Sequence, residues 1–405
     1  MQKKALPTKV KIVIIGGGVI GTSVAYHLAE RGCTDILLLD KGELGHGSSH
    51  RAAGTISKLG LTASGVEIMK HAWRTYENFK KEGDIDLHPN PYILPLWQNN
   101  PGYYQQYLKE VVNILKSLGS TAKVEALSAE KTKNIVPEIR LNDVEPGLGN
   151  VLGAVMDWES VWVDPYLLVM AYAKRARKLG VDIRTRIEVT GIIVKGGKVK
   201  GVETTAGQVE CDKIVCSAGP WASKIGKMVG LEIPVKPVRR VLIKIQKKEE
   251  TKDKWGQYQD EPGSHEKRKG LWIRHDVAGF VGSGTHEIEG KDEAVDPDNY
   301  NESYTYEEVI DFATKLDQQM PGFGEFDVVD GWAGLYEVTH DSNWIMDKAE
   351  SPEGFYLICG FSGEGIHASA AAGLFASELI LDGKVKCVKD PSLWAYNSQR
   401  FPEIL

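Results

Sequence analysis

Apolar and polar positions along the chain alternate with two periods, one typical of β-strands and one of amphipathic α-helices. The helical period is clear at Ile68, Ala72, Tyr76 and Phe79, which recur at three- and four-residue spacings. Helices are predicted at 66–82, 101–117, 166–179, 304–319 and 368–381. Strands are predicted at 12–15, 88–97, 188–194, 199–204, 213–217, 239–245, 271–283, 326–334 and 355–359, and a loop at 134–153. Interleaved strands and helices predict an α/β protein.

The first apolar run enters a glycine-rich turn, Gly16-Gly17-Gly18-Val19-Ile20-Gly21, and a helical pattern follows it. A second apolar run ends on Asp40. This is the G-x-G-x-x-G signature with a strand before it, a helix after it and an acidic residue about 20 positions on. The turn predicts that a dinucleotide pyrophosphate lies at the helix N-terminus, and Asp40 predicts a free ribose 2′-OH. The alternative is a glycine-rich turn that binds no ligand.

Composition sets broad limits on the class of protein. The 405 residues suffice for two domains, and 42% hydrophobic and 26% charged residues are ordinary for a soluble globular protein. A net charge of -6 gives no reason to expect nucleic acid or an anionic membrane as a partner. The five scattered cysteines form no C-x-x-C pair, which predicts reduced thiols and a cytoplasmic protein. No apolar stretch approaches the ~18 residues of a membrane span, and no metal site is indicated.

Further glycine-rich turns lie far along the chain. The predicted strand at 213–217 runs into Ala218-Gly219-Pro220-Trp221, and the last strand runs into Gly360-Phe361-Ser362-Gly363-Glu364-Gly365-Ile366-His367 before a helix of small residues. Both turns could return the chain to the same cofactor, although the second could also be a tight helix–sheet contact. We therefore predict a Rossmann-like cofactor domain that is discontinuous, with an inserted mixed β-sheet substrate domain, an α/β (α+β) fold. The predicted bounds are 1–85, 150–230 and 330–405 for the first domain and 86–149 and 231–329 for the second.

These motifs together resemble the D-amino-acid-oxidase superfamily of FAD-dependent oxidoreductases over nearly the whole chain. Within it, the dimethylglycine/sarcosine dehydrogenase and sarcosine oxidase branch is similar in its G-S-x-x-x-A-A-G loop and in the style of its C-terminal turn. The segments that carry the resemblance also include Val163 to Leu168, Gly331 to Tyr336 and Thr339-His340-Asp341. Eukaryotic enzymes of the branch have a folate-binding C-terminal half, which residues up to Leu405 do not include, so direct folate coupling is not expected.

The resemblance implies bound FAD and oxidation of a C–N bond in a small N-methylated or secondary amino acid, dimethylglycine- or sarcosine-like. A hydride would pass to flavin N5, and the resulting imine would be hydrolysed. The electron acceptor would be an electron-transfer protein or O2. Sarcosine oxidases activate oxygen with a lysine, which Gly279 to Gly282 does not offer, so a dehydrogenase is favoured. Alternatives are a glycine/D-amino acid or proline-type enzyme of the same superfamily, and a non-catalytic FAD-binding subunit; a homo- or hetero-oligomer is possible.

The resemblance also assigns residues to the cofactor. Non-covalent FAD is favoured, because the histidine that carries flavin in dimethylglycine dehydrogenase aligns with Arg51, one residue after His50, and the cysteine that does so in sarcosine oxidases aligns with Gly334. The predicted cofactor residues are Gly16, Gly18, Val19, Ile20, Gly21, Asp40, Lys41, Gly47, Ser48, Ser49, His50, Arg51, Ala53, Gly54, Val189, Ala218, Gly219, Trp221, Gly334, Gly360, Phe361, Ser362, Gly363, Glu364, Gly365 and Ile366.

Three residues are predicted to act on the substrate. His367 matches a carboxylate-binding lysine of sarcosine oxidases, although a histidine there could simply cap the helix. Tyr336 lies where related enzymes place an arginine or tyrosine, with a packed core tyrosine as the alternative. Arg274 could clamp a carboxylate, with a surface salt bridge as the alternative.

Overall fold

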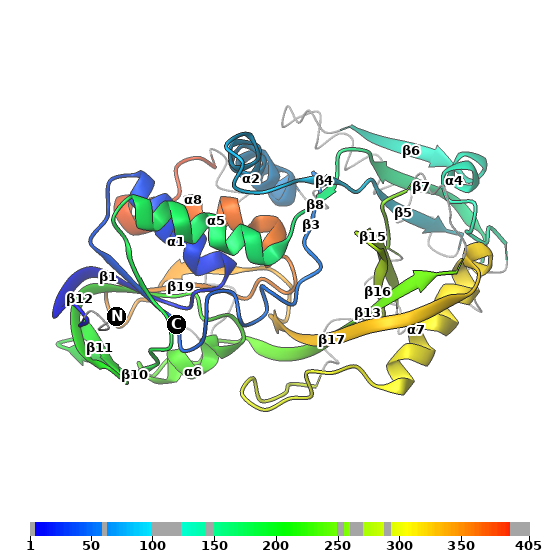
Figure 1. The fold of residues 1–405 in the computed structure, drawn as a ribbon. Helices are drawn as coiled ribbons and strands as arrows, with labels where there is room; N and C mark the ends of the chain where they lie inside the picture. Colours follow the sequence, from blue (N-terminus) through cyan, green and yellow to red (C-terminus); the bar gives the residue numbers. More distant parts are fainter. Residues whose placement is uncertain are drawn as a thin grey trace.

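A computed structural model describes residues 5–58, 63–98, 123–142, 149–248, 255–259, 270–286 and 293–388. It contains two eight-stranded mixed sheets and a small three-stranded sheet between them. Figure 1 shows the helix-covered first sheet at one end of the molecule and the second sheet at the other. The helix predicted at 101–117 lies outside the described residues.

The first sheet has a parallel centre. Strand β1 pairs with β2 on one side and β12 on the other, and β12 pairs with β19. The apolar runs form these strands because both faces of the sheet are covered. The strands are β1 (Lys9–Ile15), β2 (Ile36–Leu39), β9 (Asp182–Arg184), β10 (Val189–Lys195), β11 (Lys198–Thr204), β12 (Gly207–Cys216), β18 (Ile345–Lys348) and β19 (Phe355–Cys359).

Helices α1 (Val19–Glu30), α2 (Ala63–Lys81), α5 (Pro165–Lys178) and α8 (Gly365–Asp382) form a layer on one face of this sheet (Figure 1). Small residues allow α1 and α8 to pack closely, because a Cβ on Gly373 would lie 2.3 Å from Oγ of Ser23. Ser23 Oγ also donates to the carbonyl of Ser369 at 2.7 Å. The other face carries η1 (Gly219–Trp221) and α6 (Ala222–Lys227). None of the helices among the described residues combines the length and apolar character needed to cross a bilayer.

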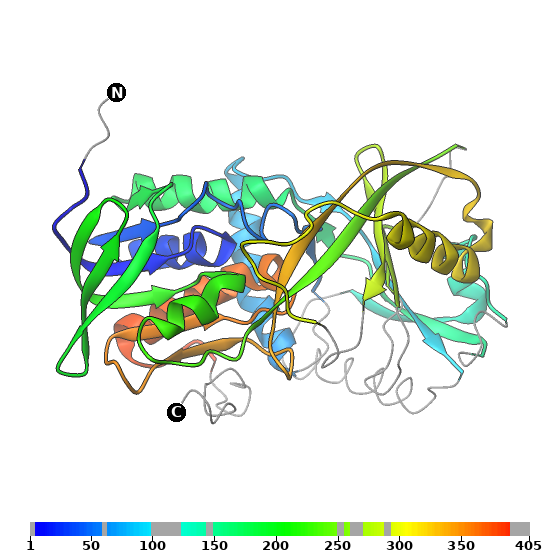
Figure 2. The same ribbon diagram turned by 90° about the horizontal axis from the view of Figure 1, so that it is seen from below.

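The second sheet has the order β17-β13-β16-β15-β14-β5-β7-β6. Figure 2 shows its two longest strands, β13 and β17, reaching from the first sheet toward helix α7. The strands are β5 (Tyr92–Trp97), β6 (Val124–Ser128), β7 (Val151–Asp157), β13 (Lys236–Lys247), β14 (Gln257–Gln259), β15 (Gly270–Asp276), β16 (Gly279–His286) and β17 (Phe326–Val338). The helices beside it are α4 (Ala129–Ile135), α7 (Tyr306–Gln319) and η2 (Pro321–Phe323), and the small sheet consists of β3 (Thr55–Ile56), β4 (His88–Pro89) and β8 (Val161–Trp162).

The predicted α/β fold with two sheet-based parts is confirmed, but several segments differ from the sequence prediction. The strand predicted at 88–97 is two strands, β4 and β5, and the one predicted at 271–283 is the pair β15 and β16. The prediction of a loop over 134–153 is wrong at its C-terminal end, because strand β7 begins at Val151 and is buried between β5 and β6. Strand β17 is longer than predicted, so Tyr336 lies on a strand. Since β7 and β17 both belong to the second sheet, the boundaries predicted at 150 and 330 do not follow the sheets. The division into domains stays a prediction.

Candidate active site

A cavity of about 1370 Å³ lies where the two sheets meet, with walls from segments between Ile15 and Ala368. It exceeds the roughly 300–1,000 Å³ of a site for a drug-sized ligand, so a dinucleotide and a small substrate have room together. Of the residues predicted from sequence, the cavity brings together Gly16, Gly18, Val19, Ile20, Asp40, Lys41, Gly47, Ser48, Ser49, Arg51, Ala53, Gly54, Val189, Ala218, Gly219, Trp221, Gly334, Tyr336, Phe361, Ser362, Gly363, Glu364, Gly365, Ile366 and His367. Gly21, His50, Arg274 and Gly360 are not among its lining residues.

The first glycine turn is tightly packed against the strands beneath it. Gly16 has a φ of +111°, and a Cβ there would lie 2.4 Å from the carbonyl oxygen of Ser217. A Cβ on Gly21 would lie 1.9 Å from the carbonyl oxygen of Gly16, so Gly21 brings α1 close to β1 without lining the cavity. No side chain caps the N-terminus of α1 at Gly18, although Ser49 Oγ accepts from the N–H of Val19 at 2.9 Å.

Asp40 lies at the end of β2, on the cavity wall. Its Oδ2 accepts from Gly17 N at 2.6 Å and its Oδ1 from Gly42 N at 2.7 Å. Burial raises the pKa of this carboxyl, although the two N–H groups act in the opposite direction. Each oxygen retains capacity for a second donor such as a ribose hydroxyl.

The loop after Asp40 turns Arg51, not His50, toward the cavity. His50 is exposed, whereas the Arg51 side chain crosses Gly334, where a Cβ would lie 2.9 Å from the Arg51 Cβ. The Arg51 guanidinium pairs with Glu302 at 2.9 Å. The missing side chain at Gly334 therefore makes room for Arg51.

The residues present fit an FAD. Ser48 Oγ is buried and has no recorded hydrogen-bond partner in the described part of the chain, so it can serve a ligand oxygen. The N-terminus of α1 offers backbone N–H groups where phosphates bind. Asp298 also lines the cavity, where it accepts from Trp221 Nε1 at 2.8 Å and pairs with Lys41 and Lys224. These polar groups and the size of the cavity match a dinucleotide.

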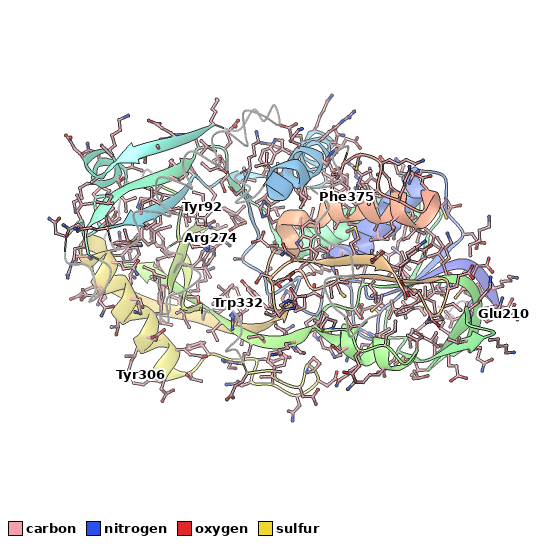
Figure 3. The ribbon with its side chains drawn as sticks, turned by 180° about the vertical axis from the view of Figure 1, so that it is seen from behind. Tyr92, Glu210, Arg274, Tyr306, Trp332 and Phe375 are labelled. Carbon is pink, nitrogen blue, oxygen red and sulfur yellow. The ribbon has the colours of Figure 1, made fainter. Side chains whose placement is uncertain are left out.

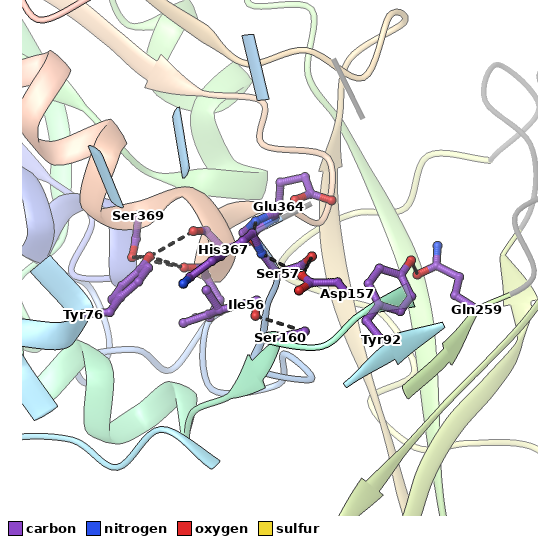
Figure 4. Close-up of polar contacts among 12 residues, drawn as sticks. Ile56, Ser57, Tyr76, Tyr92, Asp157, Ser160, Gln259, Glu364, His367 and Ser369 are labelled. Carbon is purple, nitrogen blue, oxygen red and sulfur yellow. Dashed lines mark hydrogen bonds and ion pairs between the residues drawn. The ribbon is translucent and has the colours of Figure 1, made fainter. Parts of the chain in front are cut away.

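At the other end of the cavity, His367 and Glu364 form an ion pair (Figure 4). His367 Nδ1 lies 2.5 Å from Glu364 Oε2, and its Nε2 lies 2.7 Å from the carbonyl oxygen of Ser57. Burial lowers the pKa of the imidazole, but Glu364 and the Ser57 carbonyl outweigh it, so the pKa of His367 is raised. The pKa of Glu364 is lowered by His367 against the effect of burial. Ser57 is held in turn by fully buried Asp157, whose Oδ2 accepts from Ser57 Oγ at 2.7 Å.

Tyr336 lies beside this pair, because a Cβ on Gly363 would be 2.5 Å from its ring carbon Cε2. Burial raises the pKa of its phenol, with Arg240 lowering and Glu364 raising it. The Arg240 guanidinium lies 5.5 Å from the centroid of the Tyr336 ring. Tyr336 thus lies near both a cation and a carboxylate.

The structure does not bring Arg274 to the cavity. Arg274 is buried in the second-sheet half of the molecule (Figure 3). Its Nε donates to the carbonyl of Ala53 at 2.9 Å, its Nη1 lies 3.3 Å from Asp276 Oδ1, and its guanidinium lies over Trp162. Arg274 therefore fixes the loop that contains Ala53 through a buried hydrogen bond. This contact is neither the substrate carboxylate clamp nor the surface salt bridge that the sequence suggested.

Sequence reasoning missed several charged residues of the cavity, among them Arg240 and Glu337. Arg240 could have been found from the alternation along β13, where Val241 and Ile243 enter the core and Arg240 takes the other face. Glu337 accepts from the N–H of Gly360 at 2.9 Å, and burial raises the pKa of its carboxyl to about 7. No signal in its neighbourhood distinguishes Glu337 from an ordinary strand glutamate.

Most of the chain matches the model of a known protein family. The model of the family described as DAO, FAD dependent oxidoreductase, matches residues 11–379. The pyruvate dehydrogenase phosphatase regulatory subunit of Mus musculus is 26% identical over 98% of this chain and 44% of its own length. The dimethylglycine dehydrogenase of Homo sapiens is 32% identical over 57% of this chain and 26% of its own length. The chain therefore spans less than half the length of these relatives.

A solved structure has the same fold. L-proline dehydrogenase from P. horikoshii superposes with a TM-score of 0.81 at 24% identity, covering 95% of this chain and 96% of that one. The agreement extends to nearly the full length of both chains, so both sheets and the junction between them belong to the shared architecture.

Proposed function

The chain belongs to the DAO family of FAD-dependent oxidoreductases, and from this membership we propose that it oxidises a small N-methylated or secondary amino acid, dimethylglycine- or sarcosine-like. The observation that carries the proposal is the presence of opposite charges near Tyr336: the Arg240 guanidinium lies 5.5 Å from its ring centroid, and Glu364 directly follows Gly363, which packs against the ring. A small zwitterion is complementary to that arrangement. The similarity to a dimethylglycine dehydrogenase supports the choice of amine.

The cofactor would occupy the part of the cavity formed by the first glycine turn and the loop after it. The α1 N-terminus and Ser48 would bind phosphate oxygens, and Asp40 would accept from a ribose hydroxyl. When bound, FAD supplies the two-electron acceptor for the C–N bond. We propose that attachment is non-covalent, since His50 is exposed and residue 334 is a glycine.

The substrate would lie at the Tyr336 end. Arg240 would bind its carboxylate, and the Tyr336 ring would pack against its short carbon chain. Side chains from the second sheet, among them Tyr92, Leu242 and Trp272, line the cavity and would exclude water. Among the described residues, the lysines that line the cavity are Lys41 and Lys224, and both bind Asp298. This supports a dehydrogenase, because neither lysine is available to activate O2.

The test is anaerobic reduction of the flavin by a panel of amines. The purified protein should be yellow, should release FAD into the supernatant on acid precipitation, and should be bleached by dimethylglycine or sarcosine. Reoxidation should be slow with O2 and fast with an artificial acceptor such as a phenazine. Flavin that remains in the precipitate would contradict non-covalent binding, and a flavin that no amine bleaches would contradict the enzyme.

A second candidate is a non-catalytic FAD-binding subunit. It is favoured by the similarity to a phosphatase regulatory subunit over 98% of this chain. In that case FAD would bind, but no amine in the panel would bleach it.

For the compartment we propose the cytoplasm, which the five free cysteines support.

A further inference from the structure

We infer that Glu364 recognises the amine nitrogen of the substrate, with one carboxylate oxygen held by His367 and the other available to the cavity. The inference rests on the proposed function, because it places an amino acid at the Tyr336 end. It changes the role that the sequence assigned to both residues, a cofactor contact for Glu364 and a carboxylate ligand for His367.

The charge state of the pair follows from hydrogen-bond chemistry. The Ser57 carbonyl oxygen, 2.7 Å from Nε2, accepts and never donates. The carboxylate of Glu364, 2.5 Å from Nδ1, also accepts. A neutral imidazole has one N–H, so satisfying both acceptors requires the imidazolium form of His367. The positive charge of His367 is thereby committed to Glu364 and is not free for the carboxylate of a substrate.

Glu364 is the more open partner of the two. Its side chain is 56% exposed, against 21% for His367, and both residues line the cavity. His367 occupies Oε2, and among the described residues no hydrogen-bond partner is recorded for Oε1. A carboxylate oxygen accepts N–H⁺ donors strongly, so Oε1 suits a protonated secondary or tertiary amine.

The surroundings orient a zwitterion in one direction. Glu364 follows Gly363, which packs against one edge of the Tyr336 ring, while the Arg240 guanidinium lies 5.5 Å from the centroid of that ring. An amino acid with its amine toward Glu364 and its carboxylate toward Arg240 meets an opposite charge at each end. An acid without nitrogen meets Arg240 but is opposed by Glu364. The site should therefore favour an amino acid over its carbon isostere.

The experiment compares dimethylglycine with 3-methylbutanoate, which replaces its nitrogen by carbon. With the FAD-loaded protein, the Kd of the amine is obtained from saturation of anaerobic flavin reduction, and the Kd of the isostere from the shift of the flavin spectrum. Glu364→Gln should weaken binding of the amine by about tenfold or more, as expected for loss of a charge-assisted bond. Binding of the isostere should stay equal or become tighter, because His367 is then released. Glu353→Gln is the matched control, since Glu353 also pairs with a cation, Lys198, but on the surface.

Two outcomes would overturn the inference. Glu364→Gln could bind both compounds as the wild type does, or it could lose affinity for both equally. If Glu364→Gln does not retain FAD, the variant His367→Asn is used in its place. It keeps the carboxylate of Glu364, so it must still bind dimethylglycine in preference to 3-methylbutanoate, and loss of that preference would contradict the inference. Failure of the proposed function is distinguishable, because the wild-type flavin would then respond to neither compound.

Discussion

Tyr336 packs so closely on Gly363 that a Cβ at residue 363 would lie 2.5 Å from the Cε2 atom of the tyrosine ring. Gly363→Ala should therefore displace the ring. Gly197→Ala is a suitable control. Gly197 also has a positive φ, +71° compared with +99° at Gly363, but a Cβ at residue 197 would have no atom within 4 Å. Both variants incur the ~1 kcal/mol of a left-handed alanine, and Gly363→Ala should lose about 2 kcal/mol more from overpacking. Denaturant unfolding of the two variants measures the difference, and equal losses would contradict the packing.

We expect the buried carboxyl of Glu337 to make the stability of the folded protein depend on pH. The pKa of its carboxyl is raised from an ordinary value of 4.5 to about 7, so the folded protein holds this proton more tightly than the unfolded chain. Its contribution to stability is complete below about pH 4.5 and falls as pH rises to about 7. Glu337→Gln should remove that fall and preserve the acceptor for Gly360 N. The Tm of wild type and variant, measured from pH 5 to 8, should diverge in favour of the variant; parallel curves would show that Glu337 does not titrate in this range.

The His367–Glu364 pair predicts a second dependence on pH. The raised pKa of His367 means that its contribution is complete below the ordinary pKa of 6.5 and is lost as pH rises through the raised pKa. The lowered pKa of Glu364 means that its contribution is lost as pH falls through that pKa. His367→Asn should flatten the alkaline limb of the stability profile. NMR of the ring protons measures the His367 pKa directly, and a value below the ordinary 6.5 would contradict the ion pair.

Arg274 is predicted to stabilise the cofactor loop and not to bind substrate. Arg274→Met leaves Asp276 without one partner and frees the Ala53 carbonyl, so about 3 kcal/mol of stability should be lost, as for a broken buried pair. Arg184→Met, which breaks a pair with Asp182 outside the cavity, should cost less than about 1 kcal/mol. A large loss of substrate affinity in Arg274→Met without loss of stability would restore the clamp predicted from sequence.

Asp298 is predicted to retain the cofactor. Its carboxylate joins Lys41, Lys224 and the Trp221 indole across the cavity wall, so Asp298→Asn should open that wall. FAD should dissociate faster by about tenfold, and high salt should speed dissociation from the wild type more than from the variant because it screens these ion pairs. Fluorescence of released FAD follows the rate. Identical salt dependence in both proteins would show that these pairs do not retain FAD.

The sequence predicted the parts of the site whose chemistry is local. The turn from Gly16 to Gly21 is recognisable because strand, glycines and helix are consecutive, and the family prediction built on it is confirmed. The segments from Gly47 to Gly54 and Gly360 to Ile366 were predicted for the same reason, and most of their residues line the cavity.

What the sequence did not reveal depends on pairing between distant strands. Arg240 reaches the cavity because β13 pairs with β17 in a register that places it opposite Gly334. Arg274 does not line the cavity, because its buried guanidinium is engaged by the Ala53 carbonyl, Asp276 and the Trp162 ring. No local pattern states such a register, so the sequence could not show that Arg240 lines the cavity and that Arg274 does not.

The packing of α1 against α8 has a consequence for the order of events during synthesis. Ser23 donates to the carbonyl of Ser369, 346 residues later in the chain. At about 5–20 residues per second, the N-terminal helix exists for roughly 20 to 70 s before its partner leaves the ribosome. The glycine turn at Gly16 therefore emerges early but cannot be enclosed before α8 has been translated, so capture of the cofactor has to wait for α8.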